Sequence, residues 1–261
     1  MIGKSTYEHH GLYYDELFPT LPKSWRRARL RLARQALPNI ESVCELGCGT
    51  ARTAVEFARQ GLRVYGVDLS ASMLKIARQK ILRARVPVRL IRADMRTFRL
   101  PEPVDLVSSE WGVVNHVPHR ADLLKVAKAV ALALRPGGYF LFDVNHQPVF
   151  EKVWIATHVK KTPKIFWLQQ GGWDARRRRG WQKMTWFVRQ RTGLWKRYDE
   201  AGEEVEWSTH EIRRTLRKAG FDRIRAHDYM ALTSRAGPPA GLRGLKTLFM
   251  ARKRAVPKPP K

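Results

Sequence analysis

The sequence predicts an α/β protein with a doubly wound, seven-stranded, mostly parallel sheet and an antiparallel β insertion after the fifth strand. Two observations support this fold class. Short apolar strands alternate with helical segments five times before residue 145, and a Trp-rich stretch of strand-like segments then interrupts the alternation. Such alternation is typical of parallel βαβ units with right-handed crossovers, so helices should cover both faces of one sheet.

The first half of the chain supplies five strands and the helices that connect them. Each predicted strand is short, rich in β-branched or aromatic residues, and bounded by Gly, Pro or Asp. These strands cover residues 42–46, 62–68, 88–94, 104–109 and 138–144. A helix at about 23–37 precedes them. Gly61 is expected to end the helix after the first strand, and Ser70 to cap the helix after the second.

The pattern changes after Asn145. Seven of the nine tryptophans fall within residues 150–207, among strand-like stretches separated by Gly-containing turns, which predicts an antiparallel layer. A helix at 208–220, capped by Ser208 or Thr209 with Glu211 in its first turn, and strands at 221–229 and 245–253 complete the core. The expected divisions are an N-terminal lid and helix (1–40), a core (41–145 and 208–254), the insertion (146–207) and a disordered tail (255–261).

Composition restricts the class of protein further. The 261 residues include 50 Lys+Arg against 23 Asp+Glu, a formal charge of +27, but the apolar content of 44% excludes a disordered polycation. The charge therefore lies on a folded surface and points to anionic partners. The chain has neither a signal-peptide pattern nor a membrane-length apolar run, so we expect a cytoplasmic protein. Cys44 and Cys48 lack zinc-ligand spacing, so we expect buried thiols and no metal site.

The most specific motif is VCELGCGTAR, residues 43–52. A strand leads into Glu45, the turn contains Gly47 and Gly49, and a helix starts at Thr50. The two glycines permit a tight turn that a ligand can approach closely, next to the positive end of the helix.

A carboxylate follows at the expected distance from this turn. Asp68 ends the second predicted strand, where nucleotide-binding α/β folds use an acid to accept hydrogen bonds from ribose hydroxyls. The third position after Gly49 is Arg52, so the dinucleotide pattern G-x-G-x-x-G is absent. The turn therefore indicates a nucleotide-like ligand other than NAD.

Taken in order, these motifs resemble those of the class I S-adenosylmethionine-dependent methyltransferases, in particular the small-molecule type. That family begins with E/D-x-G-x-G and ends its second strand in an acid. The resemblance continues through Ala93-Asp94-Met95, VDLVSSEWGVVNHV, LRPGGYFLFDV and LRKAGF, and about 200 of the residues can be laid on the family plan. It implies a Rossmann-like methyltransferase fold, S-adenosyl-L-methionine as cofactor and S-adenosyl-L-homocysteine as product.

The resemblance also implies roles for particular residues. Glu45 would lie near the ammonium group of the cofactor, Asp68 would bind its ribose hydroxyls, and Asp94 would accept from its adenine amino group. Packing is an alternative role for Leu69 and Met95. The residues assigned to the cofactor are Tyr14, Glu45, Gly47, Cys48, Gly49, Asp68, Leu69, Asp94, Met95 and Glu110.

The acceptor side is expected beyond the fourth and fifth strands, where ligands bind in this fold. Four residues are candidate proton acceptors: Glu110, His116, Asp143 and His146. We take Glu110 and His116 as the catalytic pair. Contacts to the substrate are expected from Trp111, His146 and Tyr13. The resemblance also makes Tyr13, Tyr14 and Asp15 a lid over the cofactor, although the tyrosines could instead cover the sheet edge.

Three functions remain open. Methyl transfer by in-line displacement to a nitrogen or oxygen of a small molecule is favoured, because the chain lacks both the Asn/Asp-Pro-Pro-aromatic turn of base methyltransferases and an RNA-binding module. The insertion would then roof the site or support dimerisation, in a monomer or homodimer. An RNA-directed methyltransferase is the alternative, and a scaffold that binds the cofactor without catalysis is the third.

The insertion bears on this choice through its charge. Residues 145–199 hold 13 Lys+Arg against three acids, a net 13 − 3 = +10, including the arginine run 176–179. Arginines with tryptophans could hold single-stranded RNA, and the charge could also suit an anionic acceptor. However, Gln182, Met184, Trp186 and Val188 form a mostly apolar row, so we favour a sheet with one packed face and one wet face.

Overall fold

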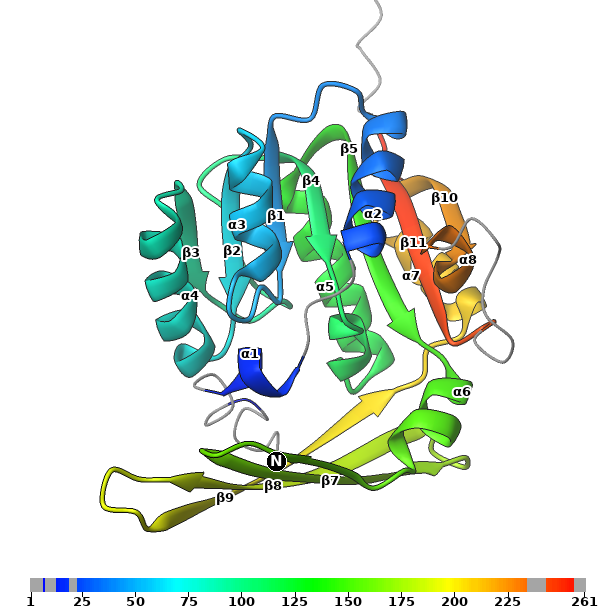
Figure 1. The fold of residues 1–261 in the computed structure, drawn as a ribbon. Helices are drawn as coiled ribbons and strands as arrows, with labels where there is room; N and C mark the ends of the chain where they lie inside the picture. The colour runs from blue at the N-terminus through cyan, green and yellow to red at the C-terminus, as the bar shows by residue number, and fades with distance from the viewer. Residues whose placement is uncertain (1–6, 8–12, 19–22, 234–242, 256–261) are drawn as a thin grey trace, which may run out of the picture.

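The computed structural model describes residues 7, 13–18, 23–233 and 243–255, which form two sheets with flanking helices (Figure 1). The strands are β1 (Ser42–Leu46), β2 (Arg63–Asp68), β3 (Val88–Arg92), β4 (Val104–Ser109), β5 (Leu134–Asn145), β6 (His158–Lys161), β7 (Ile165–Asp174), β8 (Arg179–Arg189), β9 (Trp195–Val205), β10 (Phe221–Asp228) and β11 (Lys246–Lys253). The helices are α1 (Tyr14–Leu17), α2 (Lys23–Ala36), α3 (Arg52–Arg59), α4 (Ala71–Ala84), η2 (Val113–His116), α5 (Arg120–Ala133), α6 (Gln147–Val149), η3 (Phe150–Trp154), α7 (Thr209–Lys218) and α8 (Tyr229–Thr233).

The larger sheet confirms the predicted fold class. Its strand order is β10-β11-β5-β4-β1-β2-β3, and β11 is antiparallel to both of its neighbours while the other pairs are parallel. The strand order reverses between β1 and β4, so the connections that follow these two strands lead to helices on opposite faces of the sheet. Doubly wound folds bind ligands in the crevice at such a point.

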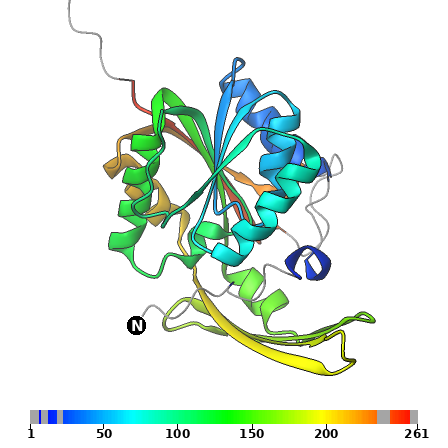
Figure 2. The same cartoon turned by 90° about the vertical axis from the view of Figure 1, so that its left-hand side faces the viewer.

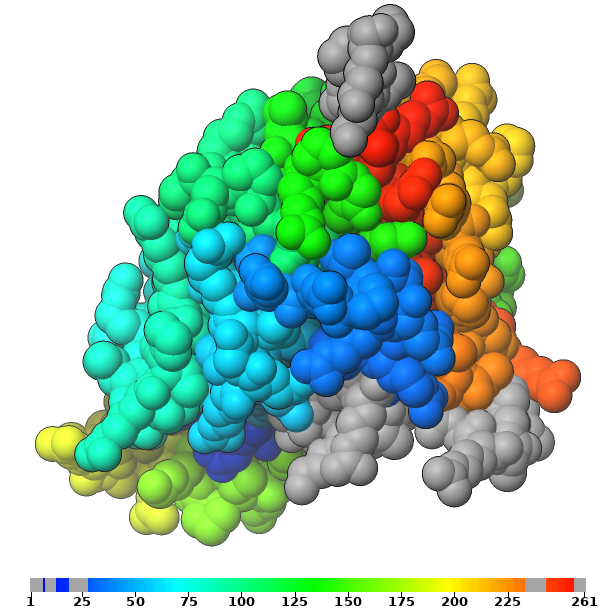
Figure 3. Space-filling view, turned by 90° about the horizontal axis from the view of Figure 1, so that it is seen from above, coloured from blue at the N-terminus to red at the C-terminus, as the bar shows by residue number. Residues whose placement is uncertain are grey.

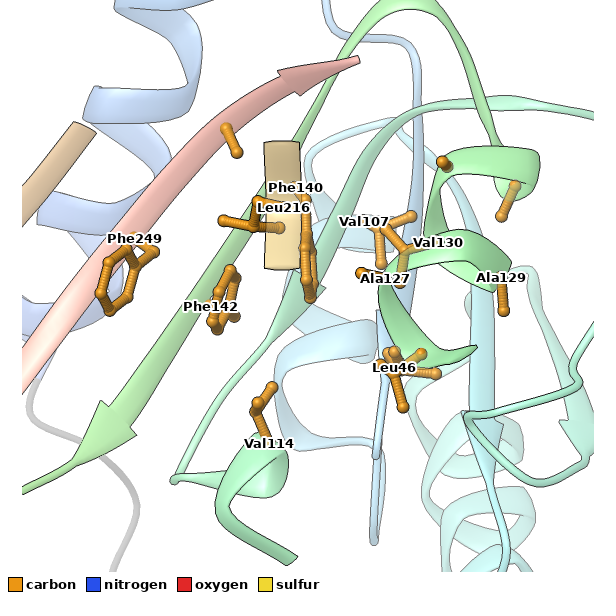
Figure 4. Packing of buried hydrophobic residues seen from close by; sticks show 14 of the residues in the cluster. Leu46, Val107, Val114, Ala127, Ala129, Val130, Phe140, Phe142, Leu216 and Phe249 are labelled. Atoms are coloured by element: carbon orange, nitrogen blue, oxygen red, sulfur yellow. The ribbon is translucent and has the colours of Figure 1, made fainter. Parts of the chain in front are cut away.

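Helices cover both faces of this sheet, as Figure 2 shows edge-on. One core joins the sheet to α5 and α7, with the rings of Phe142 and Phe140 stacked 4.2 Å apart and those of Phe142 and Phe249 5.3 Å apart (Figure 4). The other core joins it to α2, α3 and α4. Seen from above, the blue of α2 lies beside the orange and red of the C-terminal segments (Figure 3), in agreement with the packing of α2 against Tyr229 of α8.

Local signals explain several element boundaries. Ser70 caps α4 by accepting from the Met73 backbone N–H, and Ser208 with Glu211 forms a reciprocal capping box at the start of α7, both as predicted. Helix α5 ends at Ala133, shortly before Pro136, and β5 begins at Leu134. The residue before a proline disfavours helical backbone, and Leu134 already pairs with Val104 of β4.

The insertion forms the second sheet, in the order β6-β7-β8-β9, and lies beyond the carboxyl ends of the core strands with α1 between the two sheets (Figure 1). Along β8, buried residues alternate with more exposed ones, which confirms one packed face and one wet face. The packed face presents Met184, Trp186 and Val188 to Leu17 of α1. The sheet therefore covers the edge where the predicted site lies.

Some expectations concern residues outside the described ranges. The predicted tail falls on 256–261 apart from its first residue, and part of the predicted lid falls on 8–12. Within the ranges that are described, no helix is both long enough and apolar enough to cross a membrane.

Candidate active site

A cavity of about 330 Å³ lies between the two sheets, at the carboxyl ends of β1, β2 and β4. Its floor consists of the ends of these strands and the turns that follow them. Its roof includes Tyr7, α1 and β9 of the insertion. The lining residues used below are Tyr7, Tyr14, Glu45, Gly47, Cys48, Gly49, Asp68, Leu69, Asp94, Met95, Glu110, Trp111, His116 and Glu203. The structure thus brings together the residues predicted for the cofactor, and Trp111 and His116 with them.

The glycine turn after β1 shapes the floor. Gly47 has a φ of +72°, and a Cβ there would lie 2.6 Å from the Val113 side chain. Gly49 has a φ of +51°, but a Cβ there would meet nothing within 4 Å. Gly47 is therefore required for packing against η2, whereas Gly49 leaves open space for a ligand beside the backbone.

Glu45 is the least compensated acid in the floor. Its side chain is only 5% exposed, and its Oε2 has no hydrogen-bond partner among the described residues. Burial, reinforced by the nearby Glu110 carboxylate, raises the pKa of Glu45 well above its ordinary value. A buried carboxylate with a free oxygen at a cavity wall suits a positively charged ligand group.

Asp68 ties the glycine turn to the end of β2. One carboxylate oxygen accepts from the Gly49 backbone N–H at 2.7 Å and the other from that of Ser70 at 2.8 Å. Burial raises the pKa of Asp68, although these hydrogen bonds oppose it. Each oxygen retains a lone pair, so the carboxylate can still accept from a ligand hydroxyl.

The segments after β2 and β3 form the far wall. Leu69 and Met95 line the cavity there, and Leu69 is 52% exposed. Asp94 is paired with Arg96, with an Oδ2–Nη2 distance of 2.5 Å, and this pairing lowers the pKa of Asp94. An anionic acceptor is thus maintained beside Met95.

The turn after β4 is fixed from below by Asp143. This buried carboxylate accepts from the backbone N–H groups of Trp111 and Gly112, each at 3.0 Å, and pairs with Arg29 and Lys246. Asp143, which we considered as a proton acceptor, does not line the cavity and instead holds the turn that places Trp111 in it.

Glu110 lines the cavity, but its charge is compensated. Its Oε1 lies 2.9 Å from Arg29 Nε, and its Oε2 accepts from the Thr53 hydroxyl at 3.1 Å. Each of its two carboxylate oxygens therefore has a partner.

His116, at the end of η2, lies on the roof side of the cavity. Its Nε2 is 3.2 Å from the Tyr7 hydroxyl and 3.6 Å from Oε1 of Glu204. Glu204 is buried, and its Oε2 accepts from the Asn145 amide at 2.7 Å. Burial raises the pKa of Glu204, although the neighbouring His116 opposes the shift.

The short helix α1 is clamped to the core. Asp15 accepts from the Thr50 hydroxyl at 2.6 Å and pairs with Arg52 at 2.7 Å and Lys80 at 2.5 Å. Burial alone would raise the pKa of Asp15, but the contacts from Lys80 and Thr50 outweigh it and lower the pKa. Tyr14 lines the cavity, and burial raises its pKa to about 12.

Two predicted substrate residues lie elsewhere. Tyr13 packs against the apolar cluster of the insertion sheet. His146 follows β5 and contacts the Thr247 hydroxyl through Nε2 at 2.7 Å, and its burial lowers its pKa. Neither lines the cavity. The cysteines are buried and free, and burial raises the pKa of each thiol.

The sequence interpretation missed Arg29, Tyr7 and Glu204. Arg29 is 2% exposed and lies four residues before buried Ala33 on the same helix face, a spacing that could have marked it as buried. The many arginines of α2 conceal this signal. Tyr7 lines the cavity and Glu204 contacts His116, both through contacts between distant segments that no local pattern indicates.

The fold and the cavity define a class of protein: a doubly wound α/β enzyme with a nucleotide-type site at the carboxyl edge of its sheet. Comparison with known proteins supports a methyltransferase, because residues 43–138 match the family model described as a methyltransferase domain. The chain also shares the fold of solved S-adenosylmethionine-dependent methyltransferases over nearly its whole length.

Individual relatives agree with this assignment. A crystal structure of an S-adenosylmethionine-dependent methyltransferase from Clostridium acetobutylicum ATCC 824 superimposes with a TM-score of 0.79 at 21% identity, covering 96% of this chain and 100% of that one. The sugar N-methyltransferase KedS8 from Streptoalloteichus sp ATCC 53650 gives 0.77 at 21% identity, covering 97% and 96%. In sequence, the chain is 28% identical over 137 residues to dTDP-4-amino-2,3,4,6-tetradeoxy-D-glucose N,N-dimethyltransferase from Saccharopolyspora spinosa, covering 51% of this chain and 53% of that protein.

Proposed function

We propose that this enzyme transfers a methyl group from S-adenosylmethionine to a nitrogen or oxygen atom of a small molecule. The observation that carries the proposal is the covered cavity, in which cofactor-type residues of the floor face a histidine and tyrosines under a roof formed by the insertion. Its volume of about 330 Å³ is that of a small-molecule pocket.

The floor fits the cofactor. The unpartnered oxygen of Glu45 suits the ammonium group, and the open space at Gly49 leaves room for the methionine moiety beside the turn that includes Gly47 and Cys48. Asp68 retains acceptor capacity for the ribose hydroxyls. The adenine would lie against the residues of the far wall, which are Leu69, Asp94 and Met95.

The chain's own groups would position the acceptor and receive its proton. When bound, the cofactor supplies a methyl group made electrophilic by its sulfonium, so positioning accounts for most of the acceleration. Trp111 and Tyr14 would confine the acceptor, and His116 Nε2, next to the Tyr7 hydroxyl, would take up the proton where the nucleophile must lose one. Enclosure under the roof would exclude water.

The identity of the acceptor is supported only at the level of class. KedS8 and the S. spinosa enzyme are named for amino-sugar or sugar N-methylation, which supports a small-molecule acceptor here. The lining favours a neutral or cationic acceptor over the anionic one considered from composition. Glu203 and the floor carboxylates face the cavity, while the lining Arg52 is already paired with Asp15.

The RNA-directed alternative has less support, because much of the basic run is engaged. Arg178 pairs with Glu206 and Glu211, and Arg179 pairs with Glu203. Of the tryptophans in the insertion, Trp167 and Trp186 are buried against α1 and are unavailable for base stacking.

A labelling experiment separates these readings. The protein is incubated with methyl-labelled S-adenosylmethionine and a cell extract, and label is measured in the low-molecular-weight filtrate and in purified RNA. We expect label in the filtrate, and much less with His116→Ala at unchanged S-adenosylhomocysteine affinity. The matched control for His116→Ala is His158→Ala, at the edge strand β6 of the insertion. RNase-sensitive label confined to RNA would overturn the small-molecule proposal.

A further inference from the structure

Arg29 of α2 lies under the floor of the cavity, where it is almost wholly buried. Its Nε lies 2.9 Å from Oε1 of Glu110, and its Nη1 lies 3.1 Å from Oδ1 of Asp143. The remaining donors reach Ser108 Oγ, Ser109 O and Leu141 O. A helix on one face of the sheet thus delivers a fixed positive charge to the ends of β4 and β5.

This charge acts unequally on two neighbouring carboxylates. Glu110 and Glu45 both line the cavity and are both buried, and two uncompensated anions in such a place would be costly. Arg29 and Thr53 bind Glu110 directly. Glu45 accepts from the Ala54 backbone N–H and has one oxygen without a partner among the described residues.

We propose that Arg29 is a positioning residue of the cofactor site. Arg29 compensates the charge of Glu110, so that Glu45 is left to bind the ammonium group of the cofactor. Binding of that group displaces one proton from Glu45 to solvent. The O–H bond of the Glu45 carboxylic acid breaks, the proton leaves to the buffer, and the carboxylate pairs with the ammonium. This inference rests on the proposed cofactor binding.

The groups around Glu45 set the sign of the effect. Burial raises its pKa most strongly, and Glu110 at the end of β4 and Asp68 at the end of β2 raise it further. Arg29 from α2 and the Ala54 N–H from α3 lower it. Glu45 therefore keeps its proton to a higher pH than an exposed glutamate would. Below its pKa, cofactor affinity should rise with pH, and above it the affinity should level off.

Calorimetry of S-adenosylhomocysteine binding tests this without any acceptor. Titrations between about pH 5 and 8, in two buffers of different ionisation enthalpy at each pH, give the affinity and the number of protons released. For the unchanged protein we expect proton release that declines as pH rises through the pKa of Glu45, and Glu45→Gln should abolish it.

Two variants should shift the profile in opposite directions. Glu110→Gln removes a negative charge near Glu45 and should move the levelling of affinity to lower pH. Arg29→Gln should move it to higher pH. Arg34→Gln, on the same helix but hydrogen-bonded to the Gln60 side chain at the surface, should leave it unchanged. General structural damage would not produce shifts of opposite sign.

The possible outcomes distinguish a failure of the proposed cofactor binding from a failure of the proposed role of Arg29. If the unchanged protein does not bind S-adenosylhomocysteine at any pH, the proposed cofactor function fails. If it binds but releases no proton, or if Glu110→Gln leaves the profile where it was or moves it upward, the role of Arg29 is overturned. Should Arg29→Gln not fold, the Glu110→Gln shift decides alone.

Discussion

The floor and the roof of the cavity are built on different principles. The floor consists of strand ends and tight turns, and its acid Asp68 is fixed by the backbone N–H groups of Gly49 and Ser70 over distances below 3 Å. The roof consists of side chains from segments far apart in the chain, such as Tyr7 with His116. Backbone geometry can bind a cofactor that all members of a family share. An acceptor that differs between members is instead contacted by side chains, which substitutions can change without altering the fold.

The largest effect should follow from damage to the floor itself. Gly47→Ala places a Cβ 2.6 Å from Val113 at a φ of +72°, so we expect a loss of about 2 to 4 kcal/mol of unfolding free energy. S-adenosylhomocysteine affinity should fall at least about tenfold. Thermal unfolding and calorimetry measure the two.

Gly61→Ala is the matched control, because Gly61 also has a positive φ, of +81°, but open space around it. It should lose about 1 kcal/mol and bind normally. Equal binding by both variants would contradict the assignment of the glycine turn to the cofactor.

The next effect concerns the acid that fixes the turn. Asp68→Asn removes the charged acceptor of two backbone N–H groups, and hydrogen bonds to charged groups contribute about 1.5 to 3 kcal/mol each. We expect S-adenosylhomocysteine to bind about 10- to 100-fold more weakly, as measured by calorimetry. Asp174→Asn, in an exposed acid of β7, should bind as the unchanged protein does, and a similar loss there would refute a local role for Asp68.

A smaller effect is expected where roof and core join. The Glu211 carboxylate accepts from the Ser208 backbone N–H and hydroxyl, and it pairs with Arg120 of α5 and Arg178 of the insertion. Burial would raise the pKa of Glu211, but these contacts outweigh it and lower the pKa to about 2. A depressed folded-state pKa stabilises the fold above the ordinary glutamate value, and that stability is lost as pH falls toward 2.

Glu211→Gln should therefore cost about 1 to 2 kcal/mol at pH 7, measured by urea unfolding. The difference from the unchanged protein should shrink as pH falls from about 4.5 toward 2. A difference that stays constant over this window would mean that the ion pairs are not its source.

The smallest effect should come from the lid. Asp15 is clamped by Thr50, Arg52 and Lys80, but it is 36% exposed, so solvent screens these contacts. We expect Asp15→Asn to weaken S-adenosylhomocysteine binding about two- to fivefold, mainly through faster dissociation in stopped-flow measurements. The neighbouring Glu16→Gln should have no effect, and an equal effect of both would point to helix α1 charge rather than to the clamp.

The same contrast explains what the sequence could predict. Glu45, Gly47 and Gly49 fall within five residues, and Asp68 ends the adjacent strand, so a local motif and the parallel sheet suffice to bring them together. The contact between His116 and Tyr7 joins residues 109 positions apart, and Arg29 reaches Asp143 across 114. Such contacts depend on tertiary packing. No sequence pattern indicated that Arg29 binds both Glu110 and Asp143.

The Asn115 side chain connects the two ends of the insertion. Its amide donates to Asn145 O and Val205 O, the last residue of β5 and the last of β9. The insertion thus begins and ends at two strand ends that the Asn115 side chain holds together. The entropic cost of closing a loop between two such points grows only slowly with the length of the loop. The insertion sheet could therefore be replaced as a whole during evolution. Such a replacement would change the acceptor that is methylated and leave the register of the seven-stranded sheet intact.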